Sequence, residues 1–137
     1  MADMMQYDVV SPARRLASGQ ARAVQIPGAD GDFTAMPGHA PTIATIRPGI
    51  VTVKAATGDE RYVVTGGFAE ISPEGTSVLA ERAVPVEEVT QAVIDEFAEA
   101  ARAALANATE ETRDAFAKTV GDIALVAGEL GLSANID

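Results

Sequence analysis

The sequence predicts an all-β domain followed by a C-terminal antiparallel α-helical hairpin, and two observations carry this prediction. Up to about residue 85, Gly and Pro recur at intervals of roughly eight residues and separate short β-type runs. After Pro85 the apolar residues follow one another in steps of three and four, which is typical of helices. The change of period predicts two domains, residues 1–85 and residues 86–137.

Several of the β-type runs have the two-residue alternation of half-buried strands. Val51 and Val53 would face a core, and Thr52 between them would face solvent. Hairpin turns are expected at residues 57–60 and 73–75, where Gly, Asp or Pro interrupt the runs. Strands this short and numerous favour a β-sandwich or a flattened barrel. The expected strands are residues 6–11, 22–26, 42–46, 50–54, 61–65, 68–72 and 77–80.

Two apolar stripes predict the helices, the first over residues 86–104 and the second over residues 116–130. The link at residues 105–109 is short, so the helices should be antiparallel neighbours, with Asn107 or Thr109 capping the second. Helices of about 20 residues would be about 30 Å long. The stripes consist of Val86, Val89, Val93, Phe97, Ala100 and Ala104, then Phe116, Val120, Ile123, Ala127 and Leu130.

Composition and charge exclude several functions. The 137 residues include 20 acidic and 10 basic side chains, and a net charge of −10 opposes binding to nucleic acid. The absence of Cys excludes thiol catalysis, disulfides and thiolate metal sites, and a single His cannot build a multi-His site. Most of the acidity lies in residues 85–137, which hold eleven acidic and three basic residues.

No catalytic constellation is recognisable. His39 lies in a Pro/Gly loop without a partner motif, so a structural role is expected for it. Asp30 and Asp32 resemble the start of an EF-hand loop, but Pro41 stands where the bidentate Glu would be needed. We therefore expect no catalytic residue and no metal site. The chain start does not resemble a signal peptide and no apolar stretch could span a bilayer, so we expect no direct membrane insertion.

A series of motifs, taken in order, resembles the epsilon subunit of bacterial F-type, proton-translocating ATP synthases. The most specific are residues 37–41 (PGHAP) followed by residues 47–49 (RPG). Their order and spacing make the set specific over roughly residues 6–85, whereas the tail matches only in architecture. The other motifs are residues 8–12 (DVVSP), 18–19 (SG), 27–33 (PGADGDF), 64–71 (VTGGFAEI) and 78–81 (VLAE).

This resemblance implies an N-terminal β-sandwich of about ten strands and a C-terminal helical hairpin. It also implies a non-catalytic rotor subunit of the central stalk, which binds the gamma subunit and the c-ring and couples proton flow to ATP synthesis. By similarity, the loops at residues 28–32 and 37–41 lie toward the c-ring, with Asp32 and His39 as candidate contacts. The implied location is the cytoplasmic face of the bacterial cell inner membrane, where the complex holds the subunit peripherally.

The tail departs from the pattern of many relatives, whose hairpin inserts into the catalytic head through basic residues and inhibits ATP hydrolysis. Here the only basic residues of the tail are Arg102, Arg113 and Lys118. Like charges brought together at a partly buried contact repel each other. We therefore expect weak or absent inhibition, with the hairpin as the part that would meet the catalytic-head subunits.

A second departure concerns ATP, which some relatives bind through an Ile/Leu-Asp-x-x-Arg-Ala motif. Residues 94–99 read IDEFAE, so Ala98 replaces the Arg and a main phosphate partner is lost. We expect no bound cofactor, ATP included. The alternative function is a nucleotide-sensing regulatory module on the first C-terminal helix, with Asp95 and Arg102 as the residues that would hold the nucleotide.

Overall fold

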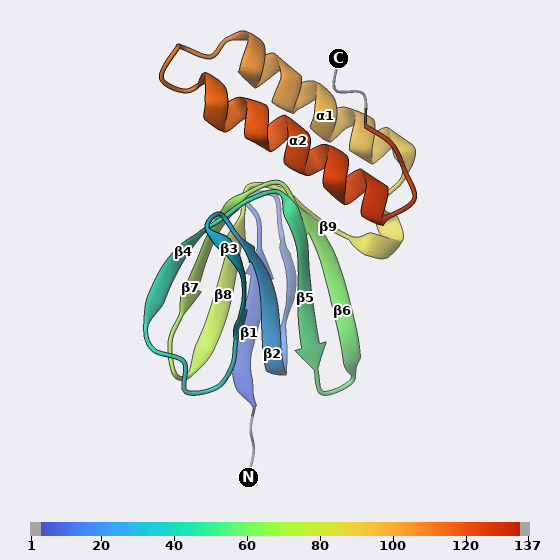
Figure 1. The fold of residues 1–137 in the computed structure, drawn as a ribbon. Helices are drawn as coiled ribbons and strands as arrows, with labels where there is room; N and C mark the ends of the chain where they lie inside the picture. The colour runs from blue at the N-terminus through green and yellow to red at the C-terminus, as the bar shows by residue number, and fades with distance from the viewer. Residues whose placement is uncertain (1–3, 135–137) are drawn as a thin grey trace. The chain divides into compact units, whose positions relative to one another are not determined.

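The computed structural model describes residues 4–134, which form two compact units that divide between Val86 and Glu87 (Figure 1). In the described residues the first unit contains nine strands and the second contains two α-helices. A short 3-10 helix, η1 (Val86–Glu88), precedes α1 (Gln91–Ala106) and α2 (Arg113–Glu129). The strands are β1 (Met5–Val10), β2 (Arg15–Gly28), β3 (Gly31–Ala35), β4 (Thr42–Ile46), β5 (Gly49–Ala55), β6 (Gly58–Val64), β7 (Gly67–Ile71), β8 (Gly75–Ala80) and β9 (Ala83–Pro85).

β2 is the long strand that joins the two layers of a sandwich. Its first half pairs antiparallel with β1, where Ala21 lies opposite Met5, and its second half pairs with β5, where Val24 lies opposite Val53. The register shifts between Ala21 and Ala23, and such an irregularity bends a strand. The strand order is β1-β8-β7-β4-β2-β5-β6-β9, with β3 paired to β2 and β1 paired to both β2 and β8. The predicted all-β plus α fold is therefore confirmed.

The core of the sandwich is built mainly from Val, Ile and Ala side chains on alternate positions of the strands. Val51 and Val53 are fully buried, as predicted, while Thr52 is only partly buried. Fully burying one such Val contributes about 1.5–3 kcal/mol relative to leaving it in water. Other fully buried core residues are Val9, Ala21, Ala35, Val64 and Ala69.

The predicted strands are present, but β3 and β9 were not expected and β2 begins at Arg15 rather than Arg22. A Ser-Gly pair at residues 18–19 normally indicates an interruption. Here Gly19 pairs with Tyr7 inside the β1–β2 ladder, and a Cβ added to Gly19 would lie 3.4 Å from the Tyr7 ring. Gly19 therefore lies against an aromatic ring in the middle of a strand, and the Ser-Gly pair does not interrupt the ladder.

The turn between β5 and β6 lies slightly earlier than predicted. Ala55 pairs with Gly58, so only the two residues between them form the turn, and Gly58 opens β6 with a φ of +131°. The turn between β7 and β8 is confirmed. There Ser72 and Gly75 exchange two backbone hydrogen bonds, with N···O distances of 2.9 and 3.3 Å.

α1 begins at Gln91, five residues later than the apolar stripe predicted, because a cap precedes it. Thr90 Oγ1 accepts a hydrogen bond from the backbone N of Val93 at 3.4 Å, which satisfies a free donor of the first turn. The stripe is also displaced, since Ala100 is exposed and Ala104 only partly buried. The buried residues of α1 are Ile94, Phe97, Ala98 and Ala101.

The link between the helices, residues 107–112, is one residue longer than predicted. α1 and α2 have 16 and 17 residues rather than about 20. Asn107 does not cap α2; it follows α1 and its Nδ2 donates to Ala103 O at 3.0 Å. Thr109 is not the cap of α2 either, because Thr112 occupies that position and accepts from the Thr109 backbone N at 3.0 Å. The second stripe is confirmed at Val120, Ile123 and Ala127.

The helices are antiparallel, as predicted, and a polar contact joins the start of the first to the end of the second. Gln91 Nε2 donates to Ser133 O at 2.6 Å, and the Ser133 backbone N donates to Gln91 Oε1 at 3.4 Å. Gln91 lies at the first position of α1, and Ser133 follows α2. The hairpin is therefore tied at its open end.

Candidate docking site

The hairpin tip of β2 and β3 (residues 28–32) contains Asp32, one of the two predicted c-ring contacts. Gly28 pairs with Gly31, so Ala29 and Asp30 form a two-residue turn. Gly31 has a φ of +133°, a conformation that side chains rarely adopt. A Cβ added to Gly28 would lie 2.5 Å from the Gly31 carbonyl oxygen. The hairpin tip therefore requires both glycines.

Arg47, in the corner between β4 and β5, holds the hairpin tip by three contacts. Its backbone N donates to Pro27 O at 2.9 Å, and its Nη1 donates to Gly28 O at 2.7 Å. Its Nη2 forms an ion pair with Asp32 Oδ1 at 2.6 Å. The Asp32 side chain is 74% exposed, so solvent weakens the charge attraction. The guanidinium nevertheless connects both strands of the hairpin to one corner.

The motifs at residues 27–33 and 47–49 interlock in this corner. A Cβ added to Gly49 would lie 2.6 Å from Pro27 Cβ, so the glycine allows the two segments to pack closely. Ala29 also donates its backbone N–H to Thr45 O at 2.8 Å. The sequence did not single out Arg47 as a functional residue. The signal that could have identified it was its place in the RPG motif, because a buried corner beside a turn needs a side chain that can satisfy free carbonyl groups.

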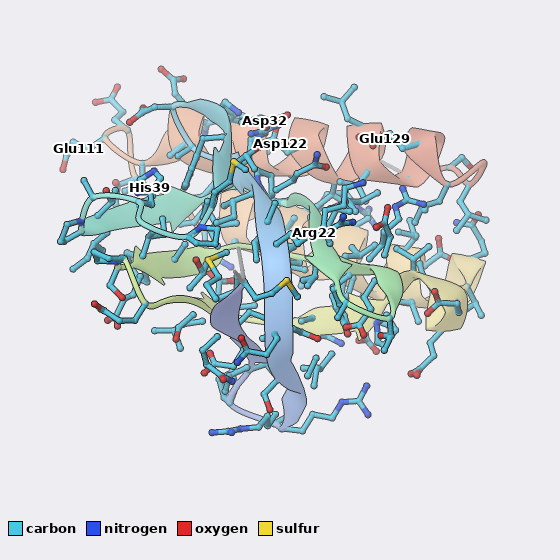
Figure 2. The ribbon with its side chains drawn as sticks, turned by 90° about the horizontal axis from the view of Figure 1, so that it is seen from below. Arg22, Asp32, His39, Glu111, Asp122 and Glu129 are labelled. Carbon is cyan, nitrogen blue, oxygen red and sulfur yellow. The ribbon has the colours of Figure 1, made fainter. Side chains whose placement is uncertain are left out.

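His39 lies at the other end of these strands. β3 leads away from the hairpin tip, and β4 returns to it with Ile46 opposite Gly28, so the loop between β3 and β4 is at the far end. In that loop, His39 Nδ1 is 2.7 Å from Ala40 O and Gly38 N donates to Pro73 O at 3.0 Å. The expectation that both loops lie toward one end of the sandwich is therefore wrong. Figure 2 labels Asp32 and His39 on their separate loops.

The outer face of the layer formed by β1, β8, β7 and β4 exposes apolar side chains. Val10 lies opposite Leu79, and Leu79 lies opposite Phe68, so the three form a line across neighbouring strands. Phe68 is 53% and Leu79 40% exposed, and Ile43 on β4 is 74% exposed. We call Val10, Ile43, Phe68 and Leu79 the outer apolar row. Contiguous exposed apolar surface is typical of a docking site for another protein.

A groove on the same layer has a different character. It has a volume of about 770 Å³, and its lining includes the carboxylates of Asp8, Glu70 and Glu74. Glu70 pairs with Ile43 across the β4–β7 ladder, so the acidic groove adjoins the outer apolar row. The face therefore combines an apolar part with an acidic part, and would complement a partner surface that carries apolar and basic side chains.

The two nucleotide candidates lie on α1. Asp95 is exposed, and its Oδ1 accepts a hydrogen bond from Gln91 Nε2 at 2.9 Å. Arg102 is half-buried and lies two turns further along the same helix. Ala98, between them, is 1% exposed.

Two further properties of residues 4–134 bear on other classes of site. The described part of the chain contains no group of three or more His, Cys, Asp or Glu residues placed to hold a metal ion. None of its helices has the length and apolar character needed to cross a membrane.

Comparison with known proteins defines the class of the first unit. The family model described as "ATP synthase, Delta/Epsilon chain, beta-sandwich domain" matches residues 4–86. A Ruegeria ATP synthase epsilon chain is 60% identical over 114 residues, covering 83% of this chain and 83% of the relative. The epsilon chain of Cereibacter sphaeroides is 51% identical and covers 96% of this chain and 99% of the relative.

The chain belongs to the ATP synthase epsilon chain family. The prediction that the chain is an ATP synthase epsilon subunit is therefore confirmed. The fold also resembles a chain in a cryo-EM structure of the Euglena gracilis mitochondrial ATP synthase, OSCP/F1/c-ring, with a TM-score of 0.65 at 23% identity. That match covers 89% of this chain and 78% of the other.

Proposed function

We propose that this subunit binds the gamma subunit through the outer apolar row and the c-ring through the hairpin tip, so that the sandwich passes rotation between them. In this role it couples proton flow to ATP synthesis without making or breaking bonds itself. The proposed location is the cytoplasmic face of the bacterial cell inner membrane, where the complex holds the subunit peripherally. Family membership and the two surfaces described above support the proposal.

The outer apolar row is the observation that carries the contact with gamma. A sandwich that works alone would place polar side chains at these outward positions, because large apolar patches on a free surface promote aggregation. Phe68 in particular exposes about half of an aromatic residue and is not part of the buried core cluster of its unit. Aromatic residues at the centre of an interface frequently supply much of the binding energy.

The affinity of purified gamma for the full chain tests this contact. Phe68→Gln and Leu79→Gln should each weaken binding about tenfold or more, since truncation of a central anchor of an interface costs about 2 kcal/mol or more. Met36→Gln is a matched control, because Met36 is 54% exposed on the same unit but outside the outer apolar row. If all three variants bind gamma as the unsubstituted chain does, the outer apolar row is not the docking surface.

The placement of Asp32 and His39 decides which end of the sandwich we assign to the c-ring. The two residues lie at opposite ends of β3 and β4, and five-residue strands separate their loops by about 16 Å. A ring that meets the sandwich at one end of its strands can contact only one of the two loops. We assign the ring to the hairpin tip and leave His39 out of the contact.

Crosslinking in the assembled synthase tests this assignment. Cys introduced at Ala29 should give a product with the c subunit, because Ala29 is exposed in the turn of the hairpin tip. Cys introduced at His39 is the matched control and should give none. A c-subunit product from position 39 alone would reverse the assignment.

The helical hairpin is proposed to inhibit ATP hydrolysis weakly or not at all, and to bind no nucleotide. Its surplus of acidic residues supports the first statement, since repulsion from an acidic segment of the catalytic head would oppose insertion. Ala98 supports the second, because an alanine offers no donor to a phosphate group where related motifs have a guanidinium. No observation favours the alternative of a nucleotide-sensing module.

A further inference from the structure

The hairpin tip carries two carboxylates in different surroundings. Asp32 is paired with Arg47 at 2.6 Å. Asp30 is exposed, and it makes no hydrogen bond or ion pair with another residue of the described chain. The Arg47 guanidinium offsets part of the Asp32 charge, although solvent screens this exposed pair. Asp30 is therefore the carboxylate of the hairpin tip whose charge no cation of the described chain offsets.

The direction in which Asp30 points depends on contacts from outside the turn. Gly28 and Gly31 flank the turn, and glycines restrict the backbone less than any other residue. The Arg47 guanidinium contacts the last residue of β2 through Gly28 O and the second residue of β3 through Asp32 Oδ1. A planar guanidinium that contacts both strands with different nitrogens fixes their relative position better than a single point charge could.

We propose that Arg47 is a positioning residue for docking, and that Asp30 rather than Asp32 is the carboxylate that the hairpin tip offers to a cationic group of its partner. The proposal rests on the docking of the hairpin tip to the c-ring put forward above. In this assignment Asp32 belongs to the support of the turn, and its charge is used within the subunit. The two residues then have separable effects. Arg47 affects how rigidly the turn is held, and Asp30 affects the electrostatic attraction to the partner.

Hydrogen exchange of the purified full chain tests the positioning role without any partner. The reporter is the backbone amide of Ala29 in the hairpin tip, which donates a hydrogen bond to Thr45 O on β4. Arg47→Gln should speed its exchange about tenfold, equivalent to about 1.4 kcal/mol of local opening free energy. Arg47→Lys should give an intermediate exchange rate, because an ammonium group can keep the ion pair with Asp32 but cannot also bond to Gly28 O in the same way. Asp30→Asn should leave the exchange rate unchanged. An unchanged rate in Arg47→Gln would overturn the positioning role.

Binding of the full chain to a synthase that lacks this subunit tests the charge assignment, measured at several salt concentrations. Asp30→Asn should weaken docking and flatten its salt dependence, because exposed charges are screened by salt. Asp32→Asn should keep the salt dependence of the unsubstituted chain. The opposite pattern would overturn the assignment to Asp30. If the Ala29→Cys chain, which keeps Asp30 and Arg47, fails to crosslink to the c subunit, the proposed function and the role of Asp30 both fail, whereas the exchange measurement still decides the role of Arg47.

Discussion

Tyr7 on β1 donates its phenolic hydrogen to Glu60 Oε1 on β6 at 2.9 Å, across 53 positions of the sequence. Tyr62 donates to the same oxygen, also at 2.9 Å. β1 and β6 are not neighbours in the strand order, so this acceptor connects strands that no ladder joins. Side-chain hydrogen bonds between the layers oppose shear of a sandwich, a resistance that the proposed transfer of rotation would require.

Removing the shared acceptor should destabilise the sandwich. Glu60→Ala removes an acceptor that the Tyr7 and Tyr62 phenols share, and the loss of a buried hydrogen-bond acceptor costs about 1–3 kcal/mol. Tyr7→Phe should cost less, about 1 kcal/mol, because Glu60 keeps its bond from Tyr62. Urea unfolding of the full chain measures both. Equal stability of Glu60→Ala and the unsubstituted chain would show that the contact does not hold the layers together.

The same pair predicts a loss of stability at alkaline pH. Burial and the nearby Glu60 raise the pKa of Tyr7 from 10.0 to about 12. Because the folded-state pKa is the higher one, this contribution is complete below pH 10 and declines as the pH rises from 10 to 12. Tyr7→Phe should reduce the decline in the free energy of unfolding over this interval. A decline of the same size in Tyr7→Phe would contradict the prediction.

Two glycines of α2 should be replaceable by alanine with a gain in stability. A Cβ added to Gly121 or Gly128 meets no atom within 4 Å, and neither residue has a positive φ. Each substitution should therefore stabilise the helix by up to about 1 kcal/mol. Gly67→Ala is the contrasting variant, because its Cβ would lie 2.2 Å from Leu79 O. Thermal unfolding measures these changes. A lower melting temperature of Gly121→Ala or Gly128→Ala would contradict the prediction, because it would mean that the added methyl group meets an atom that the described residues do not place there.

Removal of the helical hairpin should leave ATP hydrolysis by the assembled synthase nearly unchanged. The two units divide between Val86 and Glu87, so a chain that ends at Val86 keeps the whole sandwich. The acidic character of the hairpin is the physical reason for the expected small effect. The steady-state ATPase rate with and without residues 87–137 measures it, and a strong activation on truncation would show that this hairpin inhibits.

Calorimetric titration of the full chain with ATP should show no sub-millimolar binding. The Asp95 carboxylate already accepts a hydrogen bond from Gln91, and Ala98 supplies no group for a phosphate. An Asp95→Ala variant is the control that would lose any binding observed. Binding that depends on Asp95 would favour the nucleotide-sensing alternative.

Local patterns predicted the fold well because each half of the chain has a single strong period. The alternation around Val51 and the stripe around Ile123 both lead to buried residues. The start of α1 was harder to predict from the sequence. Val86 and Val89 continue the apolar spacing of the helix, but the Thr90 cap places the first turn after them. Propensity alone does not tell which of several possible caps is used.

The candidate site was only partly predictable, because it depends on strand pairing. Asp32 was identified through a motif, but its partner Arg47 is 15 positions away and reaches it only because Ile46 pairs with Gly28. The same pairing separates His39 from Asp32, which motif order could not show. The outer apolar row is likewise invisible in the sequence, since Phe68 and Leu79 read as ordinary strand residues until the register shows that they face outward together.

A cryo-EM structure of the assembled synthase that contains this subunit tests the account most directly. The account predicts that Phe68 and Leu79 are covered by the gamma subunit and that the hairpin tip, with Asp30 foremost, lies against the c-ring. An assembly in which the outer apolar row stays in water and the hairpin tip touches no ring subunit would contradict it.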